Sequence, residues 1–386
     1  MLKMPVIGCS GCGACANVCP KNCIEMKADS EGFLYPNINI ENCINCGLCE
    51  KVCPVLHEYK GNAVGKAYAC INKDEAIRLE SSSGGIFTLI AEDVIANNGI
   101  VFGAELDSDF TVRHAEVKTI DELSKLRGSK YVQSNVGDSY KKIKKLLDDG
   151  ELVLFTGTPC QISGLKMFLG KNYENLILQD IICHGVPSPK VWDIYKKYRI
   201  KNEHGSPIQR MSFRHKKYGW KTFSVLFKFL NNTEYLKTFP NDLYMRAFLS
   251  DACLRPSCYN CHSKSLNRQS DITLADFWGI ENVCPEMFDD KGTSLVFINS
   301  EKGALIFDSI KDKLAYKEVD INEAVKYNVS AHKSVALPPY RKKFFGYIQK
   351  YDFDIAVKKV LKTSVFKRAF NKLKRTAKKI LRFSRG

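Results

Sequence analysis

The sequence of 386 residues lacks any apolar run long enough to span a bilayer, which takes about 20 consecutive apolar residues. Its longest apolar stretches, such as residues 152–155, are far shorter. The first residues, MLKMPVIGCS, also lack the apolar segment and cleavage site of a secretory signal. We therefore expect a cytoplasmic protein. In that reducing compartment its 16 cysteines are expected to be metal ligands, redox groups or core residues rather than disulfides.

The sequence also lacks a G-x-G-x-x-G motif and a Walker A motif, so it predicts neither an ordinary Rossmann protein nor a P-loop protein. Charge is nearly balanced except at one end. Of the net charge of +16, residues 341–386 carry +14 and residues 1–340 carry only +2. A nearly neutral main part gives no indication of nucleic-acid binding, and we expect none.

The basic end, residues 346–386, is predicted to be a helical tail. Apolar residues recur at helical spacing from Phe366 to Leu381, and Lys and Arg fill most of the other positions. A helix of this kind can lie on an anionic membrane surface, where apolar burial and basic charge act together. A solvated or disordered tail explains the pattern equally well.

What the chain has in excess is cysteine, in a motif that occurs twice. Residues 9–20 read CSGCGACANVCP and residues 43–54 read CINCGLCEKVCP, and both follow C-x2-C-x2-C-x3-C-P. In two-cluster ferredoxins the first three cysteines of such a motif bind one 4Fe-4S cluster, and the fourth binds the other cluster. Residues 1–57 are therefore predicted to be a dicluster ferredoxin domain that passes single electrons.

The two predicted cluster sites exchange their fourth ligands. The first cluster is assigned to Cys9, Cys12, Cys15 and Cys53, and the second to Cys43, Cys46, Cys49 and Cys19. Two zinc knuckles are the alternative, although zinc needs only two separated C-x2-C pairs. The segment between the motifs predicts a small hairpin with a turn at residues 30–32. Cys23 lies outside the pattern and is expected to be a buried thiol.

A serine- and glycine-rich turn precedes a predicted helix in the next part of the chain. Residues 81–85 read SSSGG, and apolar residues from Ile86 to Ile95 follow at helical spacing. Free N–H groups, hydroxyls and the helix dipole make such a turn a possible phosphate site. A well-capped helix start is the equally simple alternative.

Two further cysteines follow apolar strands. Residues 152–155 and 175–183 predict strands joined by a helix, which implies a parallel, right-handed strand–helix–strand unit. Cys160 and Cys183 would then lie at the carboxyl edge of the sheet, where such folds bind ligands. The pair Cys258 and Cys261 could complete a four-thiolate site with them. The alternatives are a structural zinc site and plain core cysteines; Cys70 is expected in the core, and Cys253 and Cys284 remain unassigned.

Short motifs occur along residues 62–345. A hairpin predicted over residues 208–239 and a strand ending at Asp276 and Trp278 carry two of them. The motifs, in chain order, are SSSGG (81–85), GSKYVQS (128–134), GTPCQ (157–161), ICHGVPS (182–188), SFRHKKYGW (212–220), SCYNC (257–261), DITLADFWG (271–279) and PPYRKKF (338–344). Together they resemble the coenzyme F-420 hydrogenase/dehydrogenase beta-subunit family.

The resemblance implies an iron–sulfur flavoprotein. We expect an α+β architecture: the ferredoxin-like domain, an α/β flavin domain with a mixed sheet over residues 62–345, and the basic tail. Members of the family hold FAD and pass electrons between clusters, flavin and an organic acceptor, and many lie in polysaccharide gene neighbourhoods. The resemblance thus implies two N-terminal clusters, a third 4Fe-4S cluster on Cys160, Cys183, Cys258 and Cys261, and a flavin that converts one-electron into two-electron chemistry.

The resemblance also suggests site residues. The flavin phosphates are predicted on Ser82, Ser83, Gly84 and Gly85. Lys130, Tyr131 and Gln133 are candidates for the isoalloxazine surroundings. Lys130, Tyr131 and Asp276 are the catalytic candidates, and Asp276 and Arg214 are candidates for orienting the substrate. The predicted function is electron transfer from a ferredoxin or another redox partner to a deazaflavin or another small organic substrate. An electron carrier without substrate chemistry and a zinc-stabilised scaffold are the alternatives.

Overall fold

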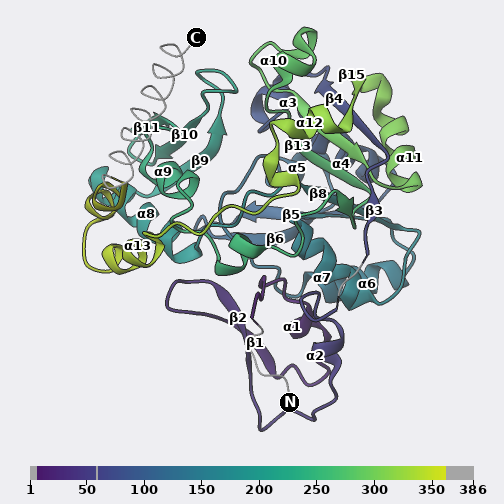
Figure 1. Ribbon diagram of the computed structural model, residues 1–386, viewed down its shortest axis with the longest axis horizontal. Coiled ribbons are helices and arrows are strands. Elements are labelled where there is room, and N and C mark those ends of the chain that lie inside the picture. Colours follow the sequence, from purple (N-terminus) through teal and green to yellow (C-terminus); the bar gives the residue numbers. More distant parts are fainter. Residues whose placement is uncertain (1–6, 58–59, 362–386) are drawn as a thin grey trace, which may run out of the picture.

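The computed structural model describes residues 7–57 and 60–361 in three parts (Figure 1). The N-terminal domain, residues 7–57, lies below the rest of the molecule in this view. Residues 60–361, called the body here, contain a large sheet and, beside it, a smaller sheet with its own helices. The predicted α+β architecture with a mixed sheet is confirmed.

The N-terminal domain consists of short elements around the two cysteine motifs. They are α1 (Ala14–Val18), β1 (Ile24–Ala28), β2 (Leu34–Ile38) and α2 (Leu48–Lys51). The strands pair antiparallel, with Ile24 opposite Ile38, so the predicted hairpin is confirmed. The carboxylate of Asp29 closes its turn, because it accepts hydrogen bonds from the backbone N–H groups of Glu31 and Phe33 at 3.0 and 2.9 Å.

The large sheet has eight strands. In sheet order they are β15 (Leu314–Val319), β4 (Lys66–Asn72), β14 (Ser294–Ile298), β13 (Ile272–Asp276), β8 (Leu176–Ile181), β7 (Val153–Gly157), β5 (Ile100–Leu106) and β6 (Val112–Val117). The four strands β13, β8, β7 and β5 run parallel, and the outer strands pair antiparallel. A two-stranded pair, β3 (Asn62–Ala63) and β12 (Asn267–Arg268), lies apart from it.

Helices cover both faces of the large sheet. One face is covered by α4 (Ile86–Ala96) and α11 (Glu301–Ile310), which bury Leu89, Ile90 and Phe307 against it. The other face is covered by α6 (Ser139–Asp148) and α7 (Pro159–Leu169) over β5, β7 and β8, and by α10 (Ile280–Val283) and α12 (Ile321–Lys326) over β4 and β14. The parallel unit β7–α7–β8 is the one that the sequence predicts.

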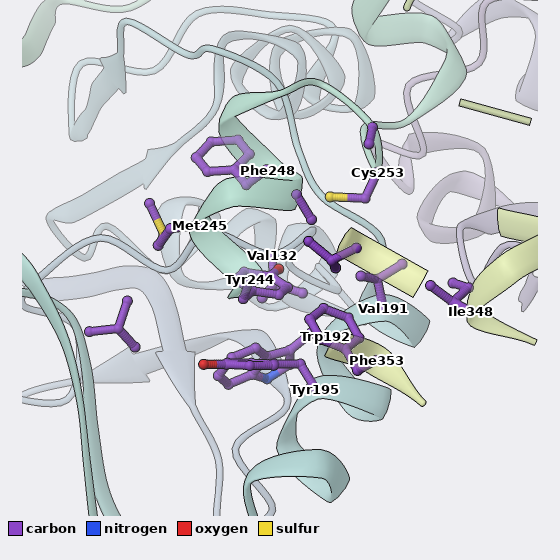
Figure 2. Packing of buried hydrophobic residues seen from close by; sticks show 14 of the residues in the cluster. Val132, Val191, Trp192, Tyr195, Tyr244, Met245, Phe248, Cys253, Ile348 and Phe353 are labelled. Carbon is purple, nitrogen blue, oxygen red and sulfur yellow. The ribbon is translucent and has the colours of Figure 1, made fainter. Parts of the chain in front are cut away.

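The smaller sheet packs against aromatic helices. Its strands β9 (Ile208–His215), β10 (Ser224–Phe229) and β11 (Glu234–Thr238) confirm the hairpin predicted over residues 208–239. They bury their apolar side chains with α8 (Pro189–Asn202) and α9 (Leu243–Leu249). Figure 2 shows Trp192, Tyr195 and Tyr244 together in this core, with Cys253 at its edge. Cys253 is therefore a core thiol.

The remaining elements are short. They are α3 (Glu75–Glu80), α5 (Ile120–Leu123) and four 3-10 turns, Pro256–Asn260, Pro285–Met287, Lys311–Lys313 and Val329–Ala331. At the C-terminal end, α13 (Arg341–Ile348) and helical residues 353–361 pack into the core of the smaller sheet. The packed body therefore runs to residue 361, beyond the predicted boundary at residue 345.

The predicted amphipathic stripe from Phe366 to Leu381 lies outside the described residues. Within residues 7–57 and 60–361, no helix is both long and apolar enough to traverse a bilayer.

Contacts on α1 and at the hairpin tip are among those that hold the N-terminal domain to the body. On α1, the Asn17 side-chain amide donates to the Gly137 carbonyl at 2.8 Å. At the hairpin tip, Lys190 Nζ donates to the Ser30 carbonyl at 2.8 Å, and the Arg341 guanidinium pairs with Glu31, one contact measuring 2.9 Å. Gly32 (φ +89°) is required there, because a Cβ would lie 2.3 Å from the Lys190 Cβ.

Candidate functional site

The structure gathers twelve of the cysteines into three sets that match the predicted ones. The first cysteine set is Cys9, Cys12, Cys15 and Cys53; the second is Cys19, Cys43, Cys46 and Cys49; the third is Cys160, Cys183, Cys258 and Cys261. The assignment of these residues as cluster ligands stays a prediction. The three sets differ in their burial and in the elements that enclose them.

The first cysteine set lies where the N-terminal domain meets the body. Burial, and to a smaller extent the neighbouring Cys9 and Cys53 thiols, raise the pKa of the Cys15 thiol to about 12. Cys53 of the second motif thus lies beside cysteines of the first motif, which the exchange of fourth ligands requires. Gly13, in the left-handed conformation (φ +79°), begins α1 and turns the chain between Cys12 and Cys15.

The second cysteine set lines one cavity, which is bordered by residues of the N-terminal domain. All four of its members border this cavity together with Cys23, and Cys46 is exposed. Cys19 therefore stands with the second motif, as the exchange also requires. Cys23 is buried, as expected, and its sulfur lies 3.3 Å from the Cys19 sulfur.

The third cysteine set lines one cavity of the body. Cys160 lies in the first turn of α7 and Cys183 follows β8, so both stand beyond the carboxyl ends of adjacent parallel strands, as predicted. Cys258 and Cys261 come from the 3-10 turn Pro256–Asn260 and its end, and all four line the same cavity. Burial raises the pKa of the Cys258 thiol to about 12, partly opposed by a hydrogen bond from the Val186 N–H.

The lining of this cavity fits an anionic cluster. Arg268 is 3% exposed and borders the cavity. One terminal nitrogen pairs with the buried Asp180 at 3.4 Å, while its Nε and the other terminal nitrogen have no hydrogen-bond partner within the described residues. Lys264 also borders it. Four thiols with two cations suit a 4Fe-4S centre, since thiolate ligands bring negative charge into a buried site. Among residues 7–57 and 60–361, no three His, Cys, Asp or Glu side chains are grouped tightly enough to hold a single metal ion.

Helix α7 brings the first and third cysteine sets together. On α7, Gly164 lies one turn after Cys160, so both are on the same face. A Cβ on Gly164 would lie 3.0 Å from the Cys12 sulfur. The cavity of the third set is likewise bordered by Gly8, Ser10 and Pro54 of the N-terminal domain. The two thiol sites are therefore neighbours across the domain junction, a proximity that the spacing of the motifs did not reveal.

The Ser–Gly turn at residues 81–85 is held firmly by its surroundings. The Ser82 hydroxyl accepts a hydrogen bond from the Ser129 N–H at 2.7 Å, so two of the family motifs meet here. The Ser83 hydroxyl donates to the Thr293 carbonyl, and the Gly84 N–H donates to the Ser294 hydroxyl. Gly85 (φ +85°) is the N-cap of α4, with no side-chain capping bond. The first N–H groups of α4 have no cap from a side chain, and the Gly84 N–H is already used.

Arg214 is the centre of a polar network beside this turn. Its guanidinium makes two contacts with the Asp276 carboxylate, at 2.8 and 2.9 Å. It also donates to the Tyr131 hydroxyl and to the Ser82 carbonyl, both at 3.0 Å. Burial, the largest influence, lowers the pKa of Arg214, but the Asp276 charge and the hydrogen bonds outweigh it and raise the pKa above its ordinary value. Arg214 thus joins three predicted site residues that are far apart in the sequence.

Two tryptophans complete this network. Trp220 Nε1 donates to the Asp276 carboxylate at 2.7 Å, and its ring stacks on Trp278 with centroids 4.8 Å apart. Below the turn, Lys216 Nζ donates to the carbonyls of Arg78, Ser83 and Lys291 at 2.7 Å each. Neither Lys216 nor Trp220 was among the residues predicted from the sequence, although both lie in the motif SFRHKKYGW.

Lys130 and Gln133 have structural partners. Lys130 Nζ donates to three carbonyls, those of Lys125, Leu126 and Arg127, which uses all three of its donors. Burial lowers the pKa of Lys130 to about 7. Gln133 accepts from Arg255 at 3.1 Å and donates to the Ser10 carbonyl at 3.4 Å. Gln133 therefore lies at the domain junction; a role for either residue beside a flavin stays a prediction.

Comparison with known proteins agrees with the two-part organisation. Residues 8–56 match the family model of the 4Fe-4S dicluster domain, and residues 150–324 match that of the coenzyme F420 hydrogenase/dehydrogenase beta subunit, C terminus. The resemblance seen in the motifs is thus confirmed over residues 150–324, and the predicted dicluster domain is confirmed over residues 8–56. The motifs SSSGG and GSKYVQS precede the matched range.

One solved structure with a similar chain is the F420-reducing [NiFe] hydrogenase complex from Methanosarcina barkeri, described as a xenon derivative. The similarity has 17% identity and a TM-score of 0.45, and it covers 81% of this chain and 95% of that chain. No curated protein matches the chain.

Proposed function

We propose that this protein is an iron–sulfur flavoprotein oxidoreductase that passes electrons from a ferredoxin or another redox partner to a small organic acceptor. The observation that carries the proposal is the order of the three cysteine sets. The second set has an exposed member, the first lies at the domain junction, and the third borders a cavity of the body that the N-terminal domain helps to line. This order leads from the surface to the interior.

The chain's own residues supply the ligands. Each predicted 4Fe-4S centre would receive four thiolates. At the third set, Lys264 would offset part of their charge, together with Arg268, which is shared with Asp180. When bound, the clusters relay single electrons and FAD converts them into two-electron chemistry. Helix α7 keeps the first and third sets adjacent, because Gly164 lets it lie against Cys12.

The flavin is proposed beside the Ser–Gly turn and the Arg214 network. The uncapped N-terminus of α4 favours negative charge, and the Ser82 hydroxyl has a proton to donate besides the bond it accepts. Arg214 adds a buried cation, and Trp278 offers an aromatic face near it. Asp276 holds Arg214 in place. A deazaflavin, or a substrate of polysaccharide biosynthesis, is the class of acceptor we propose.

An electron-transfer subunit without substrate chemistry of its own is the second candidate. The observation in its favour is that Lys130, Gln133 and the Gly84 N–H already have partners within the chain. These groups would have to exchange their partners in order to contact a flavin.

Anaerobic purification with assays of iron, sulfide, zinc and flavin tests the proposal. We expect about twelve irons, little zinc and bound FAD. Cys258→Ser should lose about four irons. Cys253→Ser is the control and should keep them all, because Cys253 is a core cysteine that lies outside every set. Iron without flavin would favour the second candidate, and zinc without iron would contradict both.

A further inference from the structure

Arg255 occupies a buried position between the first and third cysteine sets. It is 0% exposed, and it precedes the 3-10 turn Pro256–Asn260 that carries Cys258. Its side chain points into the N-terminal domain: Nε donates to the Cys9 carbonyl at 2.9 Å, and a terminal nitrogen donates to the Leu34 carbonyl at 3.0 Å. One body residue thus holds both the first cysteine loop and the hairpin.

The same guanidinium contacts a predicted ligand sulfur. The nitrogen that reaches the Leu34 carbonyl also lies 3.8 Å from the Cys9 Sγ. The other terminal nitrogen donates to the Gln133 side chain at 3.1 Å. Aromatic faces enclose the group, with the Tyr35 ring 4.2 Å from the guanidinium carbon. The hydrogen bonds of Arg255 are thus directed at two carbonyls, an amide and a thiol.

Arg255 has no carboxylate among its hydrogen-bond partners in the described part of the chain. A buried cation without an anion is costly, so a chain that keeps one needs negative charge nearby. The neighbouring groups that can supply that charge are cysteines: the Cys9 sulfur lies 3.8 Å from the guanidinium, and the Cys258 N–H donates to the Arg255 carbonyl at 2.9 Å, so Arg255 adjoins the third set as well as the first.

The first cysteine loop is shaped to receive this guanidinium. Gly11 has φ +70°, and a Cβ there would lie 2.8 Å from an Arg255 terminal nitrogen and 2.6 Å from the Gln133 amide nitrogen. Any side chain at residue 11 would displace the cation. The loop between Cys9 and Cys12 therefore lies directly on Arg255.

We propose that Arg255 is a positioning residue whose charge sets the reduction potentials of the centres on the first and third cysteine sets and holds the two sets in register. The inference rests on the proposed function. A cluster gains negative charge on reduction, and both nearby charge and hydrogen bonds to its sulfurs tune its potential. A cation at this place favours the reduced form at both centres and raises both potentials.

The test is potentiometric titration of the intact, iron-loaded protein, followed by paramagnetic resonance. In Arg255→Met and Arg255→Gln the potentials of the first and third centres should become more negative. Arg255→Lys keeps the positive charge but loses the planar guanidinium and its several donors. Its two potentials should stay close to the wild-type potentials. The centre on the second cysteine set, which Arg255 does not contact, should be unchanged in all three variants.

Arg341→Gln is the matched control, because Arg341 also joins the body to the hairpin, through Glu31, without contacting a predicted ligand. It should leave all potentials unchanged. Loss of the first centre in Arg255→Met and Arg255→Gln, together with its retention in Arg255→Lys, would also support the inference. That result would show that the first centre needs a positive charge at residue 255. Unchanged potentials in a fully loaded Arg255→Met, or equal loss in the lysine variant, would overturn the inference. Wild-type protein without clusters would instead overturn the proposed function.

Discussion

Gly164 of α7 and Cys12 of the N-terminal domain approach so closely that a Cβ on Gly164 would lie 2.9 Å from the Cys12 Cβ. The contact joins a body helix to a predicted cluster ligand 152 residues earlier in the chain. It makes α7 the physical link between two thiol sites, because Cys160 lies on the same helix.

Gly164→Val should therefore displace the first cysteine loop. Overpacking a well-filled contact typically costs about 1–3 kcal/mol, and here it also moves a ligand. We expect lower stability in urea unfolding and loss of iron from the first centre. Gly346→Val on α13 is the control, since a Cβ there would meet no atom within 4 Å. Iron content equal to that of the wild type in Gly164→Val would argue against the link.

Cys19→Ala tests the exchange of ligands between the motifs. Cys19 lines the same cavity as Cys43, Cys46 and Cys49, so its loss should damage the second centre and spare the first. Cys23→Ala is a close control, because the Cys23 sulfur is only 3.3 Å from that of Cys19 but lies outside the motif. Iron counts and paramagnetic resonance decide. An intact second centre in Cys19→Ala, or damage to the first, contradicts the assignment.

Asp276→Asn should weaken the proposed flavin site through Arg214. The change leaves a buried guanidinium without its anion, which typically costs about 3–5 kcal/mol. We expect reduced flavin retention together with lower stability. Glu318→Gln breaks the exposed pair with Lys66 instead, which solvent screens, and should change neither flavin retention nor stability. Full flavin binding by Asp276→Asn would show that the Arg214 network does not contribute to the flavin site.

His114 predicts a pH dependence of stability. Burial lowers the pKa of His114 to about 4, and its ring contacts Ser134 and Thr156 at 2.7 and 3.1 Å. Since the unfolded state takes up a proton near pH 6.5 and the folded state does not, stability should be complete above that pH. It should fall as the pH drops from about 6.5 to about 4, by up to about 3 kcal/mol. Urea unfolding of the wild type and of His114→Gln over this pH range measures the free energy of unfolding. The same pH dependence in both proteins would show that His114 does not cause it.

The basic tail is predicted to bind anionic membranes. The structure decides where a truncation must end: Phe353, Val357 and Val360 are buried in the core, so the chain should be cut after Leu361 rather than before these residues. Full-length protein should sediment with anionic vesicles and the truncated protein should not. Equal behaviour, or a preference for neutral vesicles, would remove the membrane hypothesis.

Much of the architecture could be predicted because local signals were strong. The regular spacing of the cysteines identified the dicluster domain, and apolar strands around residues 152–181 predicted a parallel unit that positions Cys160 and Cys183. Relationships between distant segments could not be predicted. Nothing in the spacing of the motifs indicated that Arg255 lies on the Cys9 loop, or that Gln133 serves the domain junction, since both depend on how the N-terminal domain docks.

The Ser–Gly turn illustrates the same limit at a single site. The sequence indicated free N–H groups at the start of α4, but the Gly84 N–H donates to Ser294 on β14, a strand 210 residues further along. Likewise, the sequence made Lys130 a candidate for the isoalloxazine surroundings, yet its three donors are used by the carbonyls of the preceding turn. The sequence predicts that a helix or turn forms. Tertiary contacts decide which of its polar groups remain free to bind a ligand.

We propose that one chain carries electrons from its thiol-bound clusters to a flavin. Adding reduced ferredoxin to the intact, iron-loaded protein under anaerobic conditions, and recording the flavin absorbance, tests this transfer. We expect bound flavin that bleaches in the wild type, and that bleaches far more slowly in Cys160→Ser although flavin is retained. Iron-loaded wild-type protein that contains no flavin would rule the transfer out.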